Sequence, residues 1–390
     1  PKIFRPLFPQ LFAICGTKEA NAVLHQLLQD QSPLVRLQAI LSLVQNRRDD
    51  FLPMIRMKAS QRDIAETEAC AYAFGIFKDA HSLSTLLEFA TSSPINIRIA
   101  ALKSLYLLGD ESKIKDLEIL ALSHNLFAIQ ALAEIPGSED TLHELLNAKN
   151  TQVRINAIAA LLARKDPRVS PHLIQLLLED ERELGLRMQS SVGGSQKALN
   201  VFSLSCEDTE EGKRERALSF IIKETLLRSA MHLPENPFLS LAKNLLESRQ
   251  SAFVPCLMQL LKNLRTEPVI NLLKKQAESI GSPLVRDYAN LTLFSLNEQG
   301  PYEARVYARL DAITQEDVIQ IRDHLPLIER QDFDNYTLSA KEKSQLLLDI
   351  FSEILARQER EGIDKVLSVM EKTNAKTRLA LAGFLIRASQ

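Results

Sequence analysis

A repeated segment constrains the fold of this chain more than any other feature. Residues 30–45 read DQSPLVRLQAILSLVQ, and their apolar side chains recur at helical spacing. One face of this helix is therefore apolar and needs a partner. Pro33 suits the first turn, where the N–H group that proline lacks would be unpaired anyway. Related segments occupy residues 93–108, 150–166, 281–297 and 374–388. Repetition of one helical unit is typical of a solenoid, in which each unit packs against its neighbours.

The repeat has a nearly constant period. Arg36, Arg98 and Arg154 occupy one position of it, and Glu68 and Asn125 fall at the same phase, with steps of 32, 30, 27 and 29 residues. Three residues after this position the chain has an alanine each time, and a small side chain lets a paired helix approach closely. We therefore predict that these second helices are centred near residues 40, 72, 102, 129 and 158.

Each second helix follows another segment with helical periodicity. Ser-Pro, Asp, Asn and Gly residues separate the two segments, as expected for turns between helices. The first helices are predicted at residues 20–28, 83–89, 114–122, 141–146 and 171–178. The unit is thus a helix, a turn, a second helix and a turn.

The pattern V-R-x-x-A-φ-x-x-L, where φ is apolar, resembles the HEAT-repeat family. The resemblance is to its short form of about 30 residues, the HEAT-like or bilin-lyase-type repeat. It covers residues 18–163 and recurs around Arg214, Arg286 and Arg378. It implies an all-α fold: a right-handed α-solenoid, or superhelix, of about twelve helical hairpins of the armadillo-like helical kind. In that family an Asp six residues before the Arg commonly joins it in a ladder between repeats. Asp30 and Arg36 keep this spacing.

The regularity of the repeat and its two interruptions divide the chain into five parts. We expect regular HEAT-like repeats at 1–182, an irregular repeat with a loop at 183–213 and HEAT-like repeats at 214–297. An irregular helical segment at 298–341 and C-terminal helical hairpins at 342–390 follow. The first irregular part is rich in glycine and should have a loop near residues 206–212. The second contains Tyr302, Tyr307 and Tyr336.

Composition argues against nucleic acid as the partner. The formal net charge is −2, so the whole chain exerts no general attraction on nucleic acid. Among HEAT-like proteins, alkylpurine DNA glycosylases line a concave cleft with Trp, Arg, Lys and a catalytic Asp, whereas this chain has no Trp. Its basic clusters are short and are expected to be solvated helix faces. A nucleic-acid-binding or DNA-repair HEAT-like protein is nevertheless the alternative function. The sequence has no run of 18 apolar residues, so it predicts no membrane-spanning helix.

The sequence predicts no catalytic residue, no metal site and no cofactor. No two of the seven His are three or four residues apart, and one His-Glu pair, at 143–144, cannot build a two-iron site. The four Cys include no C-x-x-C pair and are expected to be buried free thiols. Residues 191–197 (SVGGSQK) lack the frame of a phosphate-binding loop. A lyase-type HEAT enzyme is a weaker alternative that rests on analogy of fold alone.

The repeated arginines allow two interpretations. They could form a basic ladder for a ligand, or they could bridge adjacent hairpins through carbonyl groups at helix ends and carboxylates. We expect the structural role.

The candidate partner-binding surface comes from the phase of the second helices. Counting from the repeated arginine, −1, +3, +4 and +7 should face the core, and +2, +5, +6 and +9 should face outward. The outward side chains are small and mostly uncharged, which would suit a bound helix or extended peptide. They could instead simply let a curved array close up. The candidate residues are Gln38, Leu41, Ser42, Ala100, Lys103, Ser104, Asn156, Ala159 and Ala160.

The function predicted from the sequence is a non-catalytic protein–protein interaction scaffold or adaptor with a concave helical groove. Its partner would be a protein or peptide whose identity the sequence does not give. A cytoplasmic location is expected. The sequence begins with Pro1 and not with Met, which leaves open whether other residues or repeats precede it.

Overall fold

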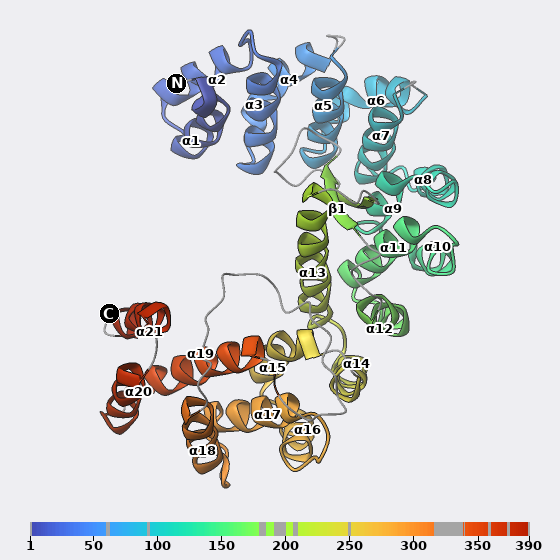
Figure 1. The fold of residues 1–390 in the computed structure, drawn as a ribbon. Coiled ribbons are helices and arrows are strands. Elements are labelled where there is room, and N and C mark those ends of the chain that lie inside the picture. Colours follow the sequence, from blue (N-terminus) through green and yellow to red (C-terminus); the bar gives the residue numbers. More distant parts are fainter. Residues whose placement is uncertain are drawn as a thin grey trace. The chain divides into compact units, whose positions relative to one another are not determined.

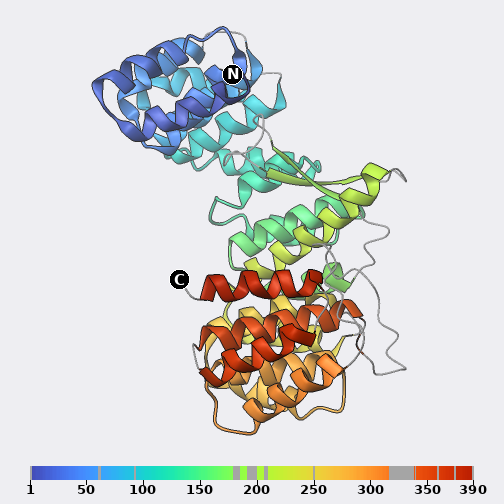
Figure 2. The ribbon, with the colours of Figure 1, turned by 60° about the vertical axis from the view of Figure 1, so that its left-hand side comes forward.

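The structure of the chain is a computed structural model, and its fold is shown in Figures 1 and 2. It describes residues 2–59, 63–91, 94–178, 185–190, 200–205, 210–248, 251–315, 338, 340–357, 360–372 and 375–388. The chain divides into two compact units. Unit 1 comprises Pro1–Val169 and Leu186–Leu204, and unit 2 comprises Ser170–Gly185 and Ser205–Gln390.

Unit 1 is a row of helical hairpins. Its first elements are η1 (Lys2–Leu7), α1 (Phe8–Cys15), α2 (Lys18–Leu27), α3 (Pro33–Gln45), η2 (Asp49–Phe51), α4 (Leu52–Ala59) and α5 (Ile64–Ile76). Next come η3 (Ala80–Ser82), α6 (Leu83–Ala90), α7 (Ile95–Leu107), α8 (Lys113–Leu122), α9 (Leu126–Leu132), α10 (Glu139–Leu145), α11 (Thr151–Ala163) and η4 (Pro167–Val169). The predicted second helices correspond to α3, α5, α7, α9 and α11. The helical solenoid predicted from the period of the repeat is therefore confirmed.

Capping residues explain where these helices begin. Asp63 accepts a hydrogen bond from the N–H of Glu66 at 3.0 Å, and Asn125 accepts one from Ala128 at 3.0 Å. These side chains satisfy N–H groups that have no partner inside the helix. In α3 a proline fills the first position, where no N–H is needed.

Five second helices also end in the same way. After each of α3, α5, α7, α11 and α17 (Pro283–Ser295) one residue adopts a left-handed conformation, with φ between 52° and 104°. The N–H of the residue after it bonds back to the carbonyl five positions earlier, at 2.8 to 3.1 Å. This is the Schellman turn, which satisfies carbonyl groups at the helix end. The left-handed residues are Arg47, Lys78, Gly109, Lys165 and Asn297.

The second helices of unit 1 lie side by side (Figure 1). Helices α5 and α7 approach each other closely. A Cβ atom on Gly75 would lie 2.4 Å from the Ser104 Oγ and 2.7 Å from the Ser104 Cα. The Ser104 hydroxyl donates to the carbonyl of Ala71 at 2.7 Å. Glycine at this position therefore allows direct contact between the two helices.

A two-stranded ribbon interrupts the helices, as Figure 2 shows in yellow-green. Strands β1 (Gly185–Ser190) and β2 (Asn200–Ser205) pair with each other. The sequence had suggested an irregular helical repeat here. However, Leu186 and Met188 alternate with Arg187 and Gln189, which is the period of a strand.

Unit 2 continues the helical pairs. They are α12 (Ser170–Leu178), α13 (Glu210–Ala230), α14 (Glu235–Glu247), η5 (Ser251–Phe253), α15 (Val254–Leu264), α16 (Glu267–Ala277), α17, α18 (Tyr302–Gln315), α19 (Ala340–Ala356), α20 (Arg360–Lys372) and α21 (Ala375–Ala388). In the part of the chain that the structure describes, ten helical pairs follow α1, compared with the twelve or so expected. Of the predicted irregular parts, residues 206–209 and Tyr336 lie outside the described residues.

Candidate functional site

The repeated arginines tie helix ends together. Arg36 donates to the carbonyl groups six and five residues before it at 2.7 and 3.1 Å, and its Nε donates to the Glu66 carboxylate of the next hairpin at 2.7 Å. Arg154 makes the same two carbonyl contacts at 3.0 and 3.1 Å. Arg378 also donates to the carbonyl groups of Met370 and Glu371 at the end of α20. For these residues the contacts are those of the structural role. The side chain of Arg214 lies outside the described residues.

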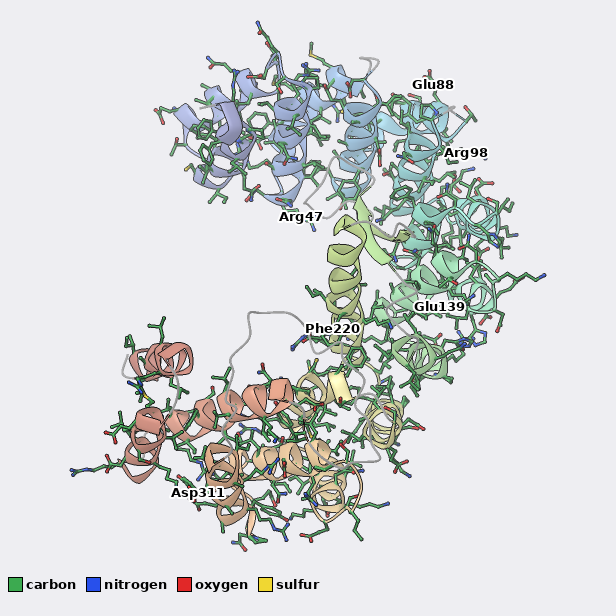
Figure 3. All side chains as sticks on the ribbon, viewed as in Figure 1. Arg47, Glu88, Arg98, Glu139, Phe220 and Asp311 are labelled. Carbon is green, nitrogen blue, oxygen red and sulfur yellow. The ribbon has the colours of Figure 1, made fainter. Side chains whose placement is uncertain are left out.

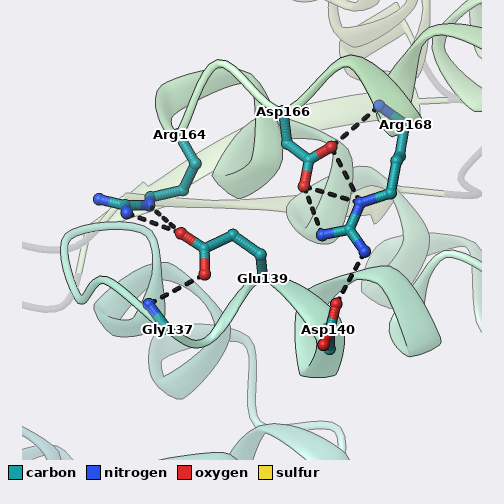
Figure 4. A network of polar contacts seen from close by, with 6 residues as sticks. All are labelled: Gly137, Glu139, Asp140, Arg164, Asp166 and Arg168. Atoms are coloured by element: carbon teal, nitrogen blue, oxygen red, sulfur yellow. Dashed lines mark hydrogen bonds and ion pairs between the residues drawn. The ribbon is translucent and has the colours of Figure 1, made fainter.

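Further ion pairs join helix ends near the end of unit 1, both within one hairpin and between neighbouring hairpins (Figure 4). Arg164, after α11, donates to the Glu139 carboxylate at the start of α10 at 2.7 Å. Arg168 binds Asp166 through Nη2 at 2.6 Å and Asp140 through Nη1 at 2.7 Å. These side chains pair with one another, so the network connects repeats and offers no open site for a ligand.

Buried carboxylates make the stability of unit 1 depend on pH. Burial alone would raise the pKa of Asp79, but hydrogen bonds from Arg56 and Ser82 outweigh it and hold the pKa below its usual range. The pKa of Asp166 is lowered in the same way by Arg168. A carboxylate with a lowered folded-state pKa stabilises the fold above its unfolded pKa, and this stability is lost as the pH falls through the folded pKa.

We therefore expect the urea midpoint of unfolding to fall as the pH drops below about 4. The Asp79→Asn variant should have a lower midpoint at pH 7 and a smaller loss on acidification, since it lacks one of the titrating groups. Circular dichroism at pH 7, 5 and 3 measures both effects. An identical pH profile for the wild type and the variant would contradict the role given to Asp79.

The outward placement of the predicted partner-binding residues is wrong for eight of the nine. Gln38, Leu41, Ser42, Ala100, Lys103, Ser104, Asn156 and Ala160 are buried, and Ala159 is half-buried. The reason is geometric: besides packing on its own first helix, each second helix packs against the second helices of neighbouring repeats. Positions counted as a solvent face are therefore contacts between repeats.

The polar members of this set are satisfied inside the array. Asn156 donates to the Gln152 carbonyl at 2.8 Å. The Lys103 ammonium lies 2.8 Å from the Glu134 carboxylate and 5.6 Å from the centre of the Tyr72 ring, above its face. The buried Lys103 charge is therefore paired, which offsets the free-energy cost of removing it from water.

One pocket of unit 1 lies among the ends of the second helices. It has a volume of about 370 Å³ and is lined by residues of α1, α3, the turn after α3 and α5, among them Gln10, Leu41, Gln45, Arg47 and Tyr72. Leu41, buried from bulk solvent, is the only one of the nine predicted residues that lines it. Gln45, another predicted outward position, also does.

The chemistry of this pocket is mixed. Tyr72 is half-buried, and burial, together with Glu134, raises the pKa of its hydroxyl, so the phenol stays neutral. Arg47 is exposed at the C-terminal end of α3 (Figure 3) and has no ion-pair partner among the described residues. Glutamine amides at positions 10 and 45 add donors and acceptors. The pocket can thus contact an apolar side chain, a peptide group and a carboxylate.

Sequence reasoning missed Arg47 and Tyr72 as lining residues. Arg47 could have been found from the turn after α3, where the left-handed residue follows the helix and projects beyond it. Tyr72 is an aromatic residue at a position that holds an aliphatic side chain in the other repeats of unit 1, namely Ile40, Leu102, Ile129 and Ile158.

A polar pocket of about 320 Å³ in unit 2 bears on the enzyme alternative. There the Tyr288 hydroxyl donates to the Asp349 carboxylate. The Glu353 carboxylate accepts from Lys262 and from Ser295, both at 2.6 Å. Burial raises the pKa of the Cys256 thiol to about 12, so this cysteine is not a reactive thiolate. These polar side chains of the pocket are hydrogen-bonded to one another.

The cysteines and possible metal ligands can be placed as well. Cys70 and Cys256 are buried free thiols, as predicted, but Cys15 is exposed, and Cys206 lies outside the described residues. No group of three or more His, Cys, Asp or Glu side chains could hold a metal ion in the part of the chain that the structure describes. Within the same residues, no helix is both long and apolar enough to cross a membrane.

Comparison with known proteins agrees with the repeat architecture. A family model for HEAT repeats matches residues 123–188, which include α9, α10, α11 and α12. No curated protein matches the chain. The matched segment is the same unit of paired helices that recurs before and after it, with the arginine contacts described above. The protein therefore carries HEAT repeats at residues 123–188.

Proposed function

We propose that this protein is a non-catalytic interaction scaffold that binds a segment of a partner protein in the unit 1 pocket. HEAT repeats are commonly protein-interaction scaffolds. The observation that carries the proposal is the 370 Å³ pocket, where exposed Arg47, which has no ion-pair partner in the described part of the chain, adjoins half-buried Tyr72. Tyr and Arg are the residue types enriched where protein interfaces gain most of their binding energy.

The pocket suits a peptide better than a nucleic acid. Leu41, Val44 and Ile76 form an apolar lining, and the neighbouring cations are largely neutralised. Arg48 pairs with Asp50 at 2.7 Å, and Lys103 pairs with Glu134 at 2.8 Å. A surface that follows phosphates would need unpaired cations repeated from one hairpin to the next. An extended segment with an apolar side chain and a nearby carboxylate would satisfy the Tyr72 ring and Arg47 together.

Affinity capture with matched variants tests the proposal. The wild type, Tyr72→Ala and Arg47→Glu would be compared with Glu88→Ala, a change at an exposed residue on first helix α6 (Figure 3), in extracts of the source cells. A partner of the pocket should be enriched about tenfold less by Tyr72→Ala and by Arg47→Glu, because each removes a central contact. Glu88→Ala should match the wild type. Equal enrichment by all four proteins, with folding verified by circular dichroism, would refute the pocket as the binding site.

A further inference from the structure

Arg286 departs from the behaviour of Arg36 and Arg154. It occupies the repeat position of Arg36 and Arg154, which donate to the carbonyl groups six and five residues earlier. Arg286 makes no hydrogen bond of this kind among the described residues. Its closest acidic contact is Asp287, whose Oδ1 lies 4.0 Å from the Arg286 Nε. Its side chain is 45% exposed, compared with 18% for Arg36. The guanidinium of Arg286 thus does not make the carbonyl contacts that Arg36 and Arg154 make.

The Arg286 side chain lines a pocket of unit 2. The pocket has a volume of about 470 Å³ and lies between the turn after α16 and the helices α17 and α18. Arg305 and Arg309, four residues apart on α18, belong to the same lining. Residues at this spacing share one face of a helix. Three guanidinium groups therefore converge on one cavity.

The acidic residues in the lining leave this cavity with an excess of positive charge. Arg305 donates to the Glu278 carboxylate at 2.8 Å, and Arg309 lies 2.8 Å from the Asp287 carboxylate. Two carboxylates thus face three guanidiniums, and Arg286 is the one without a close ion pair. An arginine can bind a carboxylate or a phosphate with two parallel hydrogen bonds, and these are stronger than neutral ones.

An exposed apolar side chain lies on the rim. Ile280, in the turn after α16, is 91% exposed and lines the same pocket. Small alanines of α16 and α18 form other parts of the lining, so a bound chain could approach closely. A charged pocket with an apolar rim matches a peptide that carries an acidic residue beside an apolar one.

We propose that this pocket is a second binding site, which takes an acidic peptide segment of a partner protein. Arg286 binds the anionic group, Arg305 and Arg309 supply the surrounding positive charge, and Ile280 contacts the neighbouring apolar side chain. The proposal rests on the interaction function proposed above, but its residues belong to unit 2 and not to the pocket at Tyr72.

Fluorescence anisotropy with a defined probe tests this site on the full chain. The probe is a fluorescein-labelled glycine–serine peptide with a central Glu-Leu-Glu-Leu. A matched peptide has Gln for Glu, and a third has phosphoserine for Glu. We expect saturable binding of the glutamate peptide, at least as tight binding of the phosphoserine peptide, and about tenfold weaker binding of the glutamine peptide.

The protein variants locate the binding. Arg286→Gln should weaken binding of the glutamate peptide about tenfold, and Ile280→Ser should weaken it about threefold. Both side chains are well exposed, so both variants should fold. Lys275→Gln removes a charge from an exposed residue on α16 outside the pocket and should bind as the wild type does. Because the unit 1 pocket would also take this peptide, Arg286→Gln is repeated in the Tyr72→Ala background, where it should cause the same relative loss.

Two results of the peptide titration would overturn this second site. One is the absence of saturable binding up to about 1 mM peptide. The other is an equal loss with Arg286→Gln and Lys275→Gln, which would indicate non-specific attraction by charge. Partner capture that depends on Tyr72 but not on Arg286 would leave the scaffold function intact while refuting this site. Tighter binding of duplex DNA than of the peptide, lost in Arg286→Gln, would assign the pocket to phosphates of nucleic acid instead.

Discussion

Replacing Ala160 by arginine is expected to destabilise unit 1 by about 4 kcal/mol, whereas the same change at Ala163 should cost less than about 0.5 kcal/mol. Both residues lie on α11. Ala160 is fully buried, so an arginine there would overpack the contact between repeats and bring in an unpaired charge. Ala163 is exposed at the C-terminal end of the helix, where a positive charge is favourable.

Native-state hydrogen exchange followed by mass spectrometry measures the effect locally. The free energy of opening should fall for amides in α9, α10 and α11 of Ala160→Arg, and amides of unit 2 serve as the internal control. If Ala160→Arg does not fold at all, Ala160→Leu should still show a smaller loss of about 2 kcal/mol. Equal effects at positions 160 and 163 would support the outward face expected from the sequence and contradict the packing of Ala160 between repeats.

A single methyl group at Gly75 is expected to cost about 2–3 kcal/mol. The added Cβ would meet the Cα of Ser104 at 2.7 Å, so rotation of the Ser104 side chain could not relieve the clash. Helices α5 and α7 would have to move apart, and the hydrogen bond from the Ser104 hydroxyl to the Ala71 carbonyl would be weakened.

Gly383→Ala is the matched control for this change. Gly383 is also helical, in α21, but a Cβ atom there has no heavy atom within 4 Å. Because alanine favours helix over glycine by about 0.5–1 kcal/mol, this variant should be neutral or slightly more stable. Hydrogen exchange of the amides in α5 and α7 should detect the lower stability of the Gly75→Ala variant. Unchanged protection of these helices would show that the contact between them is not tight.

The helices of unit 1 could be predicted from the sequence because their signals are local. Apolar spacing, the proline at the start of α3 and a capping residue such as Asn125 act within one or two turns. The ribbon at β1 and β2 was missed because a helical period was extended across glycine-rich sequence, although Leu186 and Met188 alternate with polar residues.

The direction of each helix face could not be predicted in the same way. A hydrophobic pattern separates a buried face from an exposed face, but a second helix in this array has neighbours on several sides. Ser104 and Asn156 are polar and nevertheless buried, because a hydroxyl or amide group can bond to backbone carbonyls of its own or a neighbouring helix. The unit 1 pocket depends on three helices meeting at their ends, which no single segment encodes.

Photo-cross-linking from position 72 tests the central claim most directly. A benzophenone amino acid in place of Tyr72 would be irradiated in the source cells, with the same replacement of the exposed Glu88 on α6 as the control. The scaffold proposal predicts a covalent adduct with a defined partner protein from position 72, its loss in the Arg47→Glu background and no such adduct from position 88. The same adducts from both positions, or none from position 72 in a folded protein, would contradict binding of a partner in this pocket.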